Sequence, residues 1–293
     1  LPAGNSNAAN SNAHVAYNVT QTKPMSRDWN GAGWDEVQLA QEVLGTEGNI
    51  DAVVVKSAPP DGPRPNEKVL AALVYDQVSA VSRLLVQVYD GTSWGNARVI
   101  YTYSGTTLRN YKAFDVVYEM NTSTAIVVYS DGTNASTNYN ARYATWDGTD
   151  WNDKGVMPVQ TNTSGQYVYW VRAEAQPIST STLVVAAWGG ANGYVWATTW
   201  NGTTWSATRQ LCGTGGLVTT GSAENPTTGR TFDLAFSSIT RNAYVFIGYN
   251  DYIYTAKYSG SSWTSGTTSS DLDYYGGTWR WITAKPDVSG ASD

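Results

Sequence analysis

The sequence predicts an all-β protein, a five-bladed β-propeller whose blades are four-stranded sheets. A six-residue motif, aromatic-[Asp/Asn/Ser]-Gly-x-x-Trp, occurs five times, and its final Trp recurs after 60, 57, 54 and 58 residues. Between consecutive motifs lie short runs rich in Val, Tyr, Trp and Thr, which are typical of strands. Four strands at a period near 57 residues are the signature of a propeller blade.

The motif itself predicts a tight hairpin turn. Its Asp-Gly or Asn-Gly step supplies the positive φ angles that such a turn requires. The flanking aromatic residues then become cross-strand neighbours that can pack together. The five final tryptophans are Trp34, Trp94, Trp151, Trp205 and Trp263. They are candidates for stacking against sugar rings, but their presence in every repeat favours packing between neighbouring blades.

A second set of positions recurs in the first apolar run of each repeat. Its members are Asp51, Asp115, Trp170, Asp233 and Trp281, and Glu119 and Glu174 lie on two of the same strands. We expect these residues on the innermost strands, near the wall of a central channel. Carboxylates from separate blades could act as the acid and base of a glycosidase. The favoured interpretation is that the aspartates accept hydrogen bonds at the channel rim, or hold a calcium ion or water.

The two ends of the chain carry complementary parts of one blade. Three strands within about residues 13–42 lack a first strand, and one strand at about residues 278–286 lacks the other three. We expect these parts to pair and close the ring, which leaves no open sheet edge. Residues 13–293 then form one propeller domain after a polar leader, residues 1–12. If the last strand entered a neighbouring chain instead, the exchange would propagate as a fibre.

Composition excludes many function classes. The chain has 18 Lys and Arg against 24 Asp and Glu, which argues against a nucleic-acid partner. The chain has one cysteine, Cys212, so an intrachain disulfide is excluded. It has one histidine, His14, which removes most routes to zinc, haem or Ser/His/Asp chemistry. We therefore expect no cofactor and no metal centre, apart from weak calcium binding at the Asp-Gly turns.

Sequence features also indicate where the protein acts. No apolar run approaches the length of a membrane helix, so no membrane span is expected. Five Asn-x-Ser/Thr sequons and a low charge content are typical of an exported protein, which predicts an extracellular or cell-surface location. The sequons are at Asn18, Asn121, Asn134, Asn162 and Asn201.

The repeat resembles that of secreted bacterial and archaeal β-propeller proteins with WDGTxW hairpins. The resemblance covers residues from about 13 to 286 and is clearest over residues 114–151, which read FDVVYE…VVYSDG…RYATWDGTDW. A more distant resemblance is to five-bladed tachylectin-type lectins. Both imply the propeller fold, and neither transfers a sugar-binding residue to a position of this chain.

The favoured function is a non-catalytic extracellular structural or adhesive propeller, a subunit of a cell-surface assembly or filament. Its partners would be other copies of itself or surface proteins. A glycan-binding lectin is the alternative, and a glycosidase is the second alternative. The segment Asp147–Trp151 lacks the residue that a sialidase Asp-box places between its Asp and Gly, which argues against a sialidase.

Overall fold

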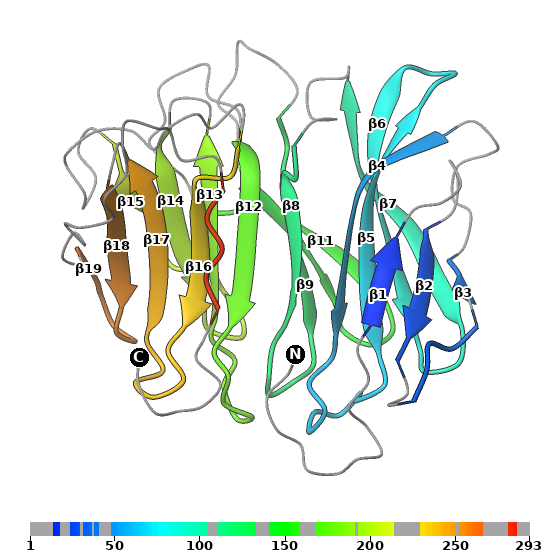
Figure 1. Ribbon diagram of the computed structural model, residues 1–293, viewed down its shortest axis with the longest axis horizontal. Coiled ribbons are helices and arrows are strands. Elements are labelled where there is room, and N and C mark those ends of the chain that lie inside the picture. Colours follow the sequence, from blue (N-terminus) through cyan, green and yellow to red (C-terminus); the bar gives the residue numbers. More distant parts are fainter. Residues whose placement is uncertain are drawn as a thin grey trace. The chain divides into compact units, whose positions relative to one another are not determined.

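The computed structural model contains five antiparallel β-sheets and, within the residues it describes, no helix (Figure 1). The described residues are 14–17, 24–29, 32–36, 38–40, 48–104, 111–132, 141–158, 168–190, 193–213, 229–249, 252–265 and 281–285. The chain divides into two compact units, Leu1–Ala58 with Pro65–Asn110, and Pro59–Arg64 with Tyr111–Asp293. The predicted leader, residues 1–12, lies outside the described residues.

The first unit holds two sheets. The first has three strands in the order β1 (His14–Tyr17), β2 (Met25–Asp28) and β3 (Gln38–Leu39). The second has four strands, β4 (Gly48–Ser57), β5 (Lys68–Asp76), β6 (Val81–Tyr89) and β7 (Trp94–Ser104). Among the described residues, the strands at residues 13–42 thus form a sheet of three strands, as the sequence predicts.

The second unit holds three four-stranded sheets. They consist of β8 (Phe114–Tyr118), β9 (Ala125–Ser130), β10 (Ala141–Trp146) and β11 (Trp151–Val156); β12 (Val168–Ala175), β13 (Val184–Gly190), β14 (Val195–Trp200) and β15 (Arg209–Cys212); and β16 (Phe232–Phe236), β17 (Ala243–Tyr249), β18 (Tyr252–Tyr258) and β19 (Trp263–Ser265). Each sheet is a meander of consecutive antiparallel strands. The prediction of four strands per repeat is therefore confirmed for these sheets.

The hairpin turns form as the motif predicts. Gly91, Gly148 and Gly202 have φ angles of 103°, 106° and 99°, a region that residues with a Cβ rarely enter. The side chain before each glycine closes the turn: Asp147 Oδ1 accepts hydrogen bonds from the backbone N–H groups of Thr149 (2.9 Å) and Asp150 (3.0 Å). Hydrogen bonding lowers the pKa of Asp147 to about 2, and the bond from the backbone of Asp150 has the largest effect. The carboxylate is therefore ionised whenever the turn is formed near neutral pH.

The aromatic residues that flank each turn are cross-strand neighbours, which confirms the prediction. Their ring centroids lie 5.2–5.6 Å apart in all five pairs. The pairs are Trp29–Trp34, Tyr89–Trp94, Trp146–Trp151, Trp200–Trp205 and Tyr258–Trp263.

The first strands of the sheets in the second unit lie side by side. The backbone N–H of Val171 in β12 donates to the carbonyl of Lys112, just before β8, at 3.2 Å. The N–H of Ile282 donates in the same way to the carbonyl of Arg230, just before β16, at 3.0 Å. Residues 281–285, red in Figure 1, therefore run beside β16 as β12 runs beside β8. This segment occupies the place of a further first strand.

Candidate functional site

A network of charged side chains links the first strands of the three sheets in the second unit. Arg172, on β12, stands at its centre. Its Nη1 donates to Asp115 Oδ2 on β8 at 2.9 Å, and its Nε donates to Asp233 Oδ1 on β16 at 2.6 Å. Its Nη2 donates to Glu174 Oε1 at 2.8 Å. One guanidinium thus holds three carboxylates, two of them from neighbouring sheets.

Each aspartate has a second cation, three residues earlier in the chain. Lys112 Nζ lies 3.1 Å from Asp115 Oδ1, and Arg230 Nη2 lies 3.2 Å from Asp233 Oδ2. Each aspartate also accepts a backbone N–H from the next first strand, that of Ala173 at 3.1 Å for Asp115 and that of Ala284 at 2.8 Å for Asp233. The same arrangement therefore occurs twice, and it fastens each first strand to the next.

Burial governs the electrostatics of this network. Asp115 and Asp233 are 0% and 1% exposed. Burial lowers the pKa of Lys112 and of Arg230, because it disfavours the charged form of a base. Burial also acts on Arg172, but the attraction of Asp115, Glu174 and Asp233 outweighs it and raises the pKa of Arg172. The network is a set of mutually neutralised ions.

Beside the network lies a group of aromatic rings that we call the aromatic platform, Tyr111, Tyr169, Trp170 and Trp281. Tyr111 stacks on Tyr169 at 4.1 Å between centroids, and Trp170 meets Tyr111 at 6.0 Å and Trp281 at 5.6 Å edge to face. The guanidinium carbon of Arg230 lies 4.8 Å from the Trp281 centroid. Trp170 is buried, whereas Trp281 is 56% exposed. The platform therefore presents one large ring to solvent in a fixed orientation.

The predicted first-strand residues are only partly in register. Asp115 and Asp233 pair with Val128 and Phe246, and the residue at the matching position of β12 is Arg172, opposite Ala187. Trp170 lies two residues before this position. Trp281 occupies the position equivalent to Trp170, because Val171 and Ile282, the residues after them, make equivalent backbone hydrogen bonds. β12 and β13 pair without a shift from Trp170 to Ala175, so Trp170 stands two residues before the position that the aspartates occupy, and spacing along the chain misplaces the column there.

Asp51, the remaining member of the column, lies on β4 in the first unit. The pairing of β4 with β5 shifts between Ile50 and Ala52, at this residue, and Asp51 is half-buried. Sequence reasoning missed Lys112, Arg172 and Arg230. Two of them carried a signal, since a basic residue stands three positions before Asp115 and before Asp233.

The hairpin tryptophans differ in exposure. Trp94, Trp151 and Trp205 are buried, Trp263 is half-buried, and Trp34 is 45% exposed. Trp205 packs edge to face against Tyr143 of the neighbouring sheet at 5.8 Å. This contact is of the interblade kind that the sequence favours. The role of these five residues as sugar-stacking groups stays a prediction.

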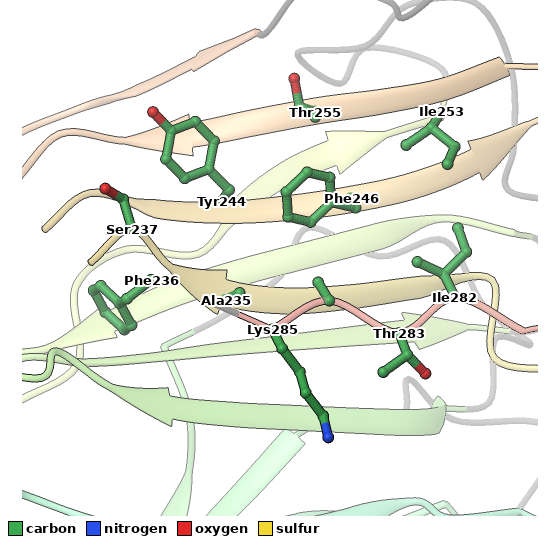
Figure 2. A pocket seen from close by; sticks show the side chains of 11 residues that line it. Ala235, Phe236, Ser237, Tyr244, Phe246, Ile253, Thr255, Ile282, Thr283 and Lys285 are labelled. Carbon is green, nitrogen blue, oxygen red and sulfur yellow. The ribbon is translucent and has the colours of Figure 1, made fainter. Parts of the chain in front are cut away.

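A cavity of about 540 Å³ lies between β16–β18 and residues 281–285 (Figure 2). Its walls include Tyr244, Phe246 and Ile253, opposite Ile282, while Lys285 points away from β17. By register, Tyr244 and Phe246 correspond to Ile126 and Val128 on β9, which are buried in the core shared with the next sheet. The rings that line the cavity therefore stand at positions that, on β9, pack against the next sheet.

Two features are absent from the part of the chain that the structure describes. Within it, no helix has the length and apolarity to cross a membrane. The same residues contain no group of three or more His, Cys, Asp or Glu side chains arranged to hold a metal ion. The weak calcium binding expected at the Asp-Gly turns stays a prediction.

No protein-family model matches the sequence, and no curated protein matches it either. Solved structures do resemble it. An α-L-arabinofuranosidase from Fusarium graminearum matches with a TM-score of 0.52 and 13% identity over 84% of this chain and 73% of that chain. The Aleuria aurantia lectin, in complex with Fucα1-6GlcNAc, matches with a TM-score of 0.50 and 14% identity over 94% and 81%. A Penicillium chrysogenum α-L-arabinanase matches with a TM-score of 0.50 and 11% identity over 84% and 73%. The chain is thus similar in fold to β-propeller lectins and glycosidases.

Proposed function

We propose that the protein is a carbohydrate-binding β-propeller and that the aromatic platform contacts the sugar. The observation that carries this proposal is Trp281, whose ring is 56% exposed although it contacts Trp170 edge to face and the guanidinium of Arg230. A flat ring fixed in this way can stack on the apolar face of a sugar with little loss of side-chain entropy. Propellers of similar fold include a fucoside-binding lectin and enzymes acting on arabinose-containing glycans, which supports the same ligand class.

Binding without hydrolysis fits the network better than catalysis does. A glycosidase needs one carboxylic acid that can give up a proton and one carboxylate that is free to attack or to activate water. In the network both oxygens of Asp115 and both oxygens of Asp233 are bonded to cations or backbone donors. Glu174 is bonded to Arg172. The network therefore supports binding rather than hydrolysis, and the test below also detects glycosidase activity.

The comparisons give no support to the structural or adhesive role that the sequence favoured first. We therefore propose the alternative function, carbohydrate binding, instead of the structural or adhesive role. The extracellular location and self-association predicted from the sequence stay predictions.

Replacing Trp281 by Ala should weaken glycan binding and leave the fold intact, because the ring is mostly exposed. The readout is a glycan array, followed by calorimetric titration with the glycans that bind the wild-type protein; we expect at least a tenfold loss of affinity. Ile239→Ala, an exposed apolar residue in a turn of the same unit, is the matched control and should bind normally.

Three outcomes would contradict the proposal. If the wild-type protein bound no glycan, carbohydrate binding would be wrong. If Tyr244→Ala or Trp34→Ala abolished binding while Trp281→Ala did not, the sugar would bind at the cavity or at the hairpins instead. If the wild-type protein released reducing sugars from an oligosaccharide that it binds, the glycosidase would be the correct alternative.

We also propose the ring closure that the sequence predicts, in which the C-terminal segment completes the three-stranded sheet β1–β3. The support is that residues 281–285 have the bonding pattern of a first strand, and that this sheet has, among the described residues, one strand fewer than the other four. Deleting residues 277–293 should give a poorly folded protein that an added peptide of the same sequence rescues. A deletion variant as stable as the full chain would contradict closure, and an intact chain that is polymeric would show exchange between copies.

A further inference from the structure

Arg230 contacts the segment that carries Trp281 in three ways. Its backbone carbonyl accepts the N–H of Ile282 at 3.0 Å, and its Nη2 donates to the carbonyl of Ile282 at 2.9 Å. Its guanidinium carbon lies over the Trp281 ring, 4.8 Å from the centroid. One residue therefore fixes both the backbone on which the ring stands and the ring itself.

The guanidinium of Arg230 is itself fixed and buried. Its Nη2 lies 3.2 Å from Asp233 Oδ2, and the same oxygen accepts the N–H of Ala284 at 2.8 Å, further along the Trp281 segment. Arg230 is 6% exposed, whereas Trp281 is 56% exposed. A ligand at the platform would therefore meet the ring, and Arg230 would affect the ligand through the ring.

The equivalent position one sheet earlier in the unit is occupied by a lysine. The carbonyl of Lys112 accepts the N–H of Val171, the residue after Trp170, as that of Arg230 does for the residue after the exposed ring. The ammonium of Lys112 lies 3.1 Å from Asp115, and Trp170 is only 7% exposed. Lysine thus occurs beside the buried ring and arginine beside the exposed one. Only the planar guanidinium can both donate in a fixed fork and lie over a ring.

We infer that Arg230 is the positioning residue of the aromatic platform, and that it holds the Trp281 ring in one orientation before a sugar binds. A guanidinium within about 6 Å of a Trp centroid is attracted to the ring. A ring that is ordered beforehand loses less side-chain entropy when the ligand arrives, which raises affinity. The effect on affinity rests on the proposed function, whereas the orientation of the ring can be measured without a ligand.

Arg230→Lys tests the effect on affinity, because it keeps the charge beside Asp233 and removes the planar fork. Calorimetric titration of the full-length protein should show an affinity about threefold to tenfold lower for the glycans that the wild-type protein binds. In the Trp281→Ala background the same substitution should change affinity by less than about twofold, because the residue acts through the ring. An equal loss in both backgrounds would overturn the inference, since Arg230 would then act without Trp281.

The orientation of the ring is measured by ¹⁹F NMR on the full-length protein labelled with 5-fluorotryptophan. Trp281→Ala identifies the Trp281 resonance by its absence. Arg230→Lys should change the line width of this resonance, because the ring would exchange between orientations. The dispersion of the other tryptophan resonances reports that the variant is folded. An unchanged line width at Trp281 would overturn the inference.

Lys112→Arg is the matched control, because it exchanges the same two residue types at the equivalent position beside Trp170. It should leave both the Trp281 resonance and the affinity unchanged. Equal effects of Lys112→Arg and Arg230→Lys would overturn the inference, because general loosening of the network would then explain them. If the wild-type protein bound no glycan, the proposed function would fall, and the Trp281 resonance would still decide whether Arg230 positions the ring.

Discussion

Replacing Asp233 by Ala should lower the free energy of unfolding by about 3–5 kcal/mol, since it leaves buried cations without their partner. Asp233 receives hydrogen bonds from Arg172 at 2.6 Å, Arg230 at 3.2 Å and the backbone of Ala284 at 2.8 Å, and it is almost fully buried. The substitution leaves two guanidinium groups under-compensated and releases the segment at residues 281–285. The effect is therefore large for one side chain.

Urea unfolding followed by tryptophan fluorescence measures this loss. Asp233→Asn keeps a hydrogen-bond acceptor but not the charge and should fall between the wild-type protein and Asp233→Ala. Asp61→Ala removes an exposed carboxylate from a turn and should change the free energy by no more than about 0.5 kcal/mol. A loss below about 1 kcal/mol for Asp233→Ala would mean that the network contributes little to stability.

Replacing Trp205 by Ala should also cost about 3–5 kcal/mol, through the cavity that it leaves in the core. Its ring is buried against Trp200 at 5.4 Å and against Tyr143 of the neighbouring sheet at 5.8 Å. Loss of the ring therefore weakens both a hairpin and the packing between two sheets. Glycan binding per folded molecule should be unchanged, because the ring is not accessible to a ligand.

Trp263→Ala is the matched control for this prediction. Trp263 occupies the same position of the motif and pairs with Tyr258 at 5.2 Å, but it is only half-buried. Its loss should cost no more than about 1.5 kcal/mol. Equal losses in the two variants, or loss of glycan binding in Trp205→Ala without loss of stability, would contradict the assignment of Trp205 to packing.

The hairpins and sheets were predictable because their causes are local. The turn at Asp147 and Gly148 needs only a side chain that accepts hydrogen bonds and a residue that tolerates positive φ, and both are visible in the sequence. The aromatic pair Trp146 and Trp151 follows directly, since the turn places these residues opposite each other. Recurrence of the motif then determined the number of sheets, and the complementary ends indicated a sheet with three strands.

The candidate site was not predictable in this way, because its residues meet only through the packing of sheets. Asp115 and Asp233 are 118 residues apart in the sequence, and they share Arg172 from a third strand. Spacing along the chain does not reveal this meeting, because it selects Trp170, two residues before Arg172, as the equivalent of the two aspartates. The sequence alone thus determined which segments become strands and turns. Only the tertiary structure decided which charges neutralise one another and that Trp281 presents an exposed ring, because burial and pairing depend on neighbours that lie far apart along the chain.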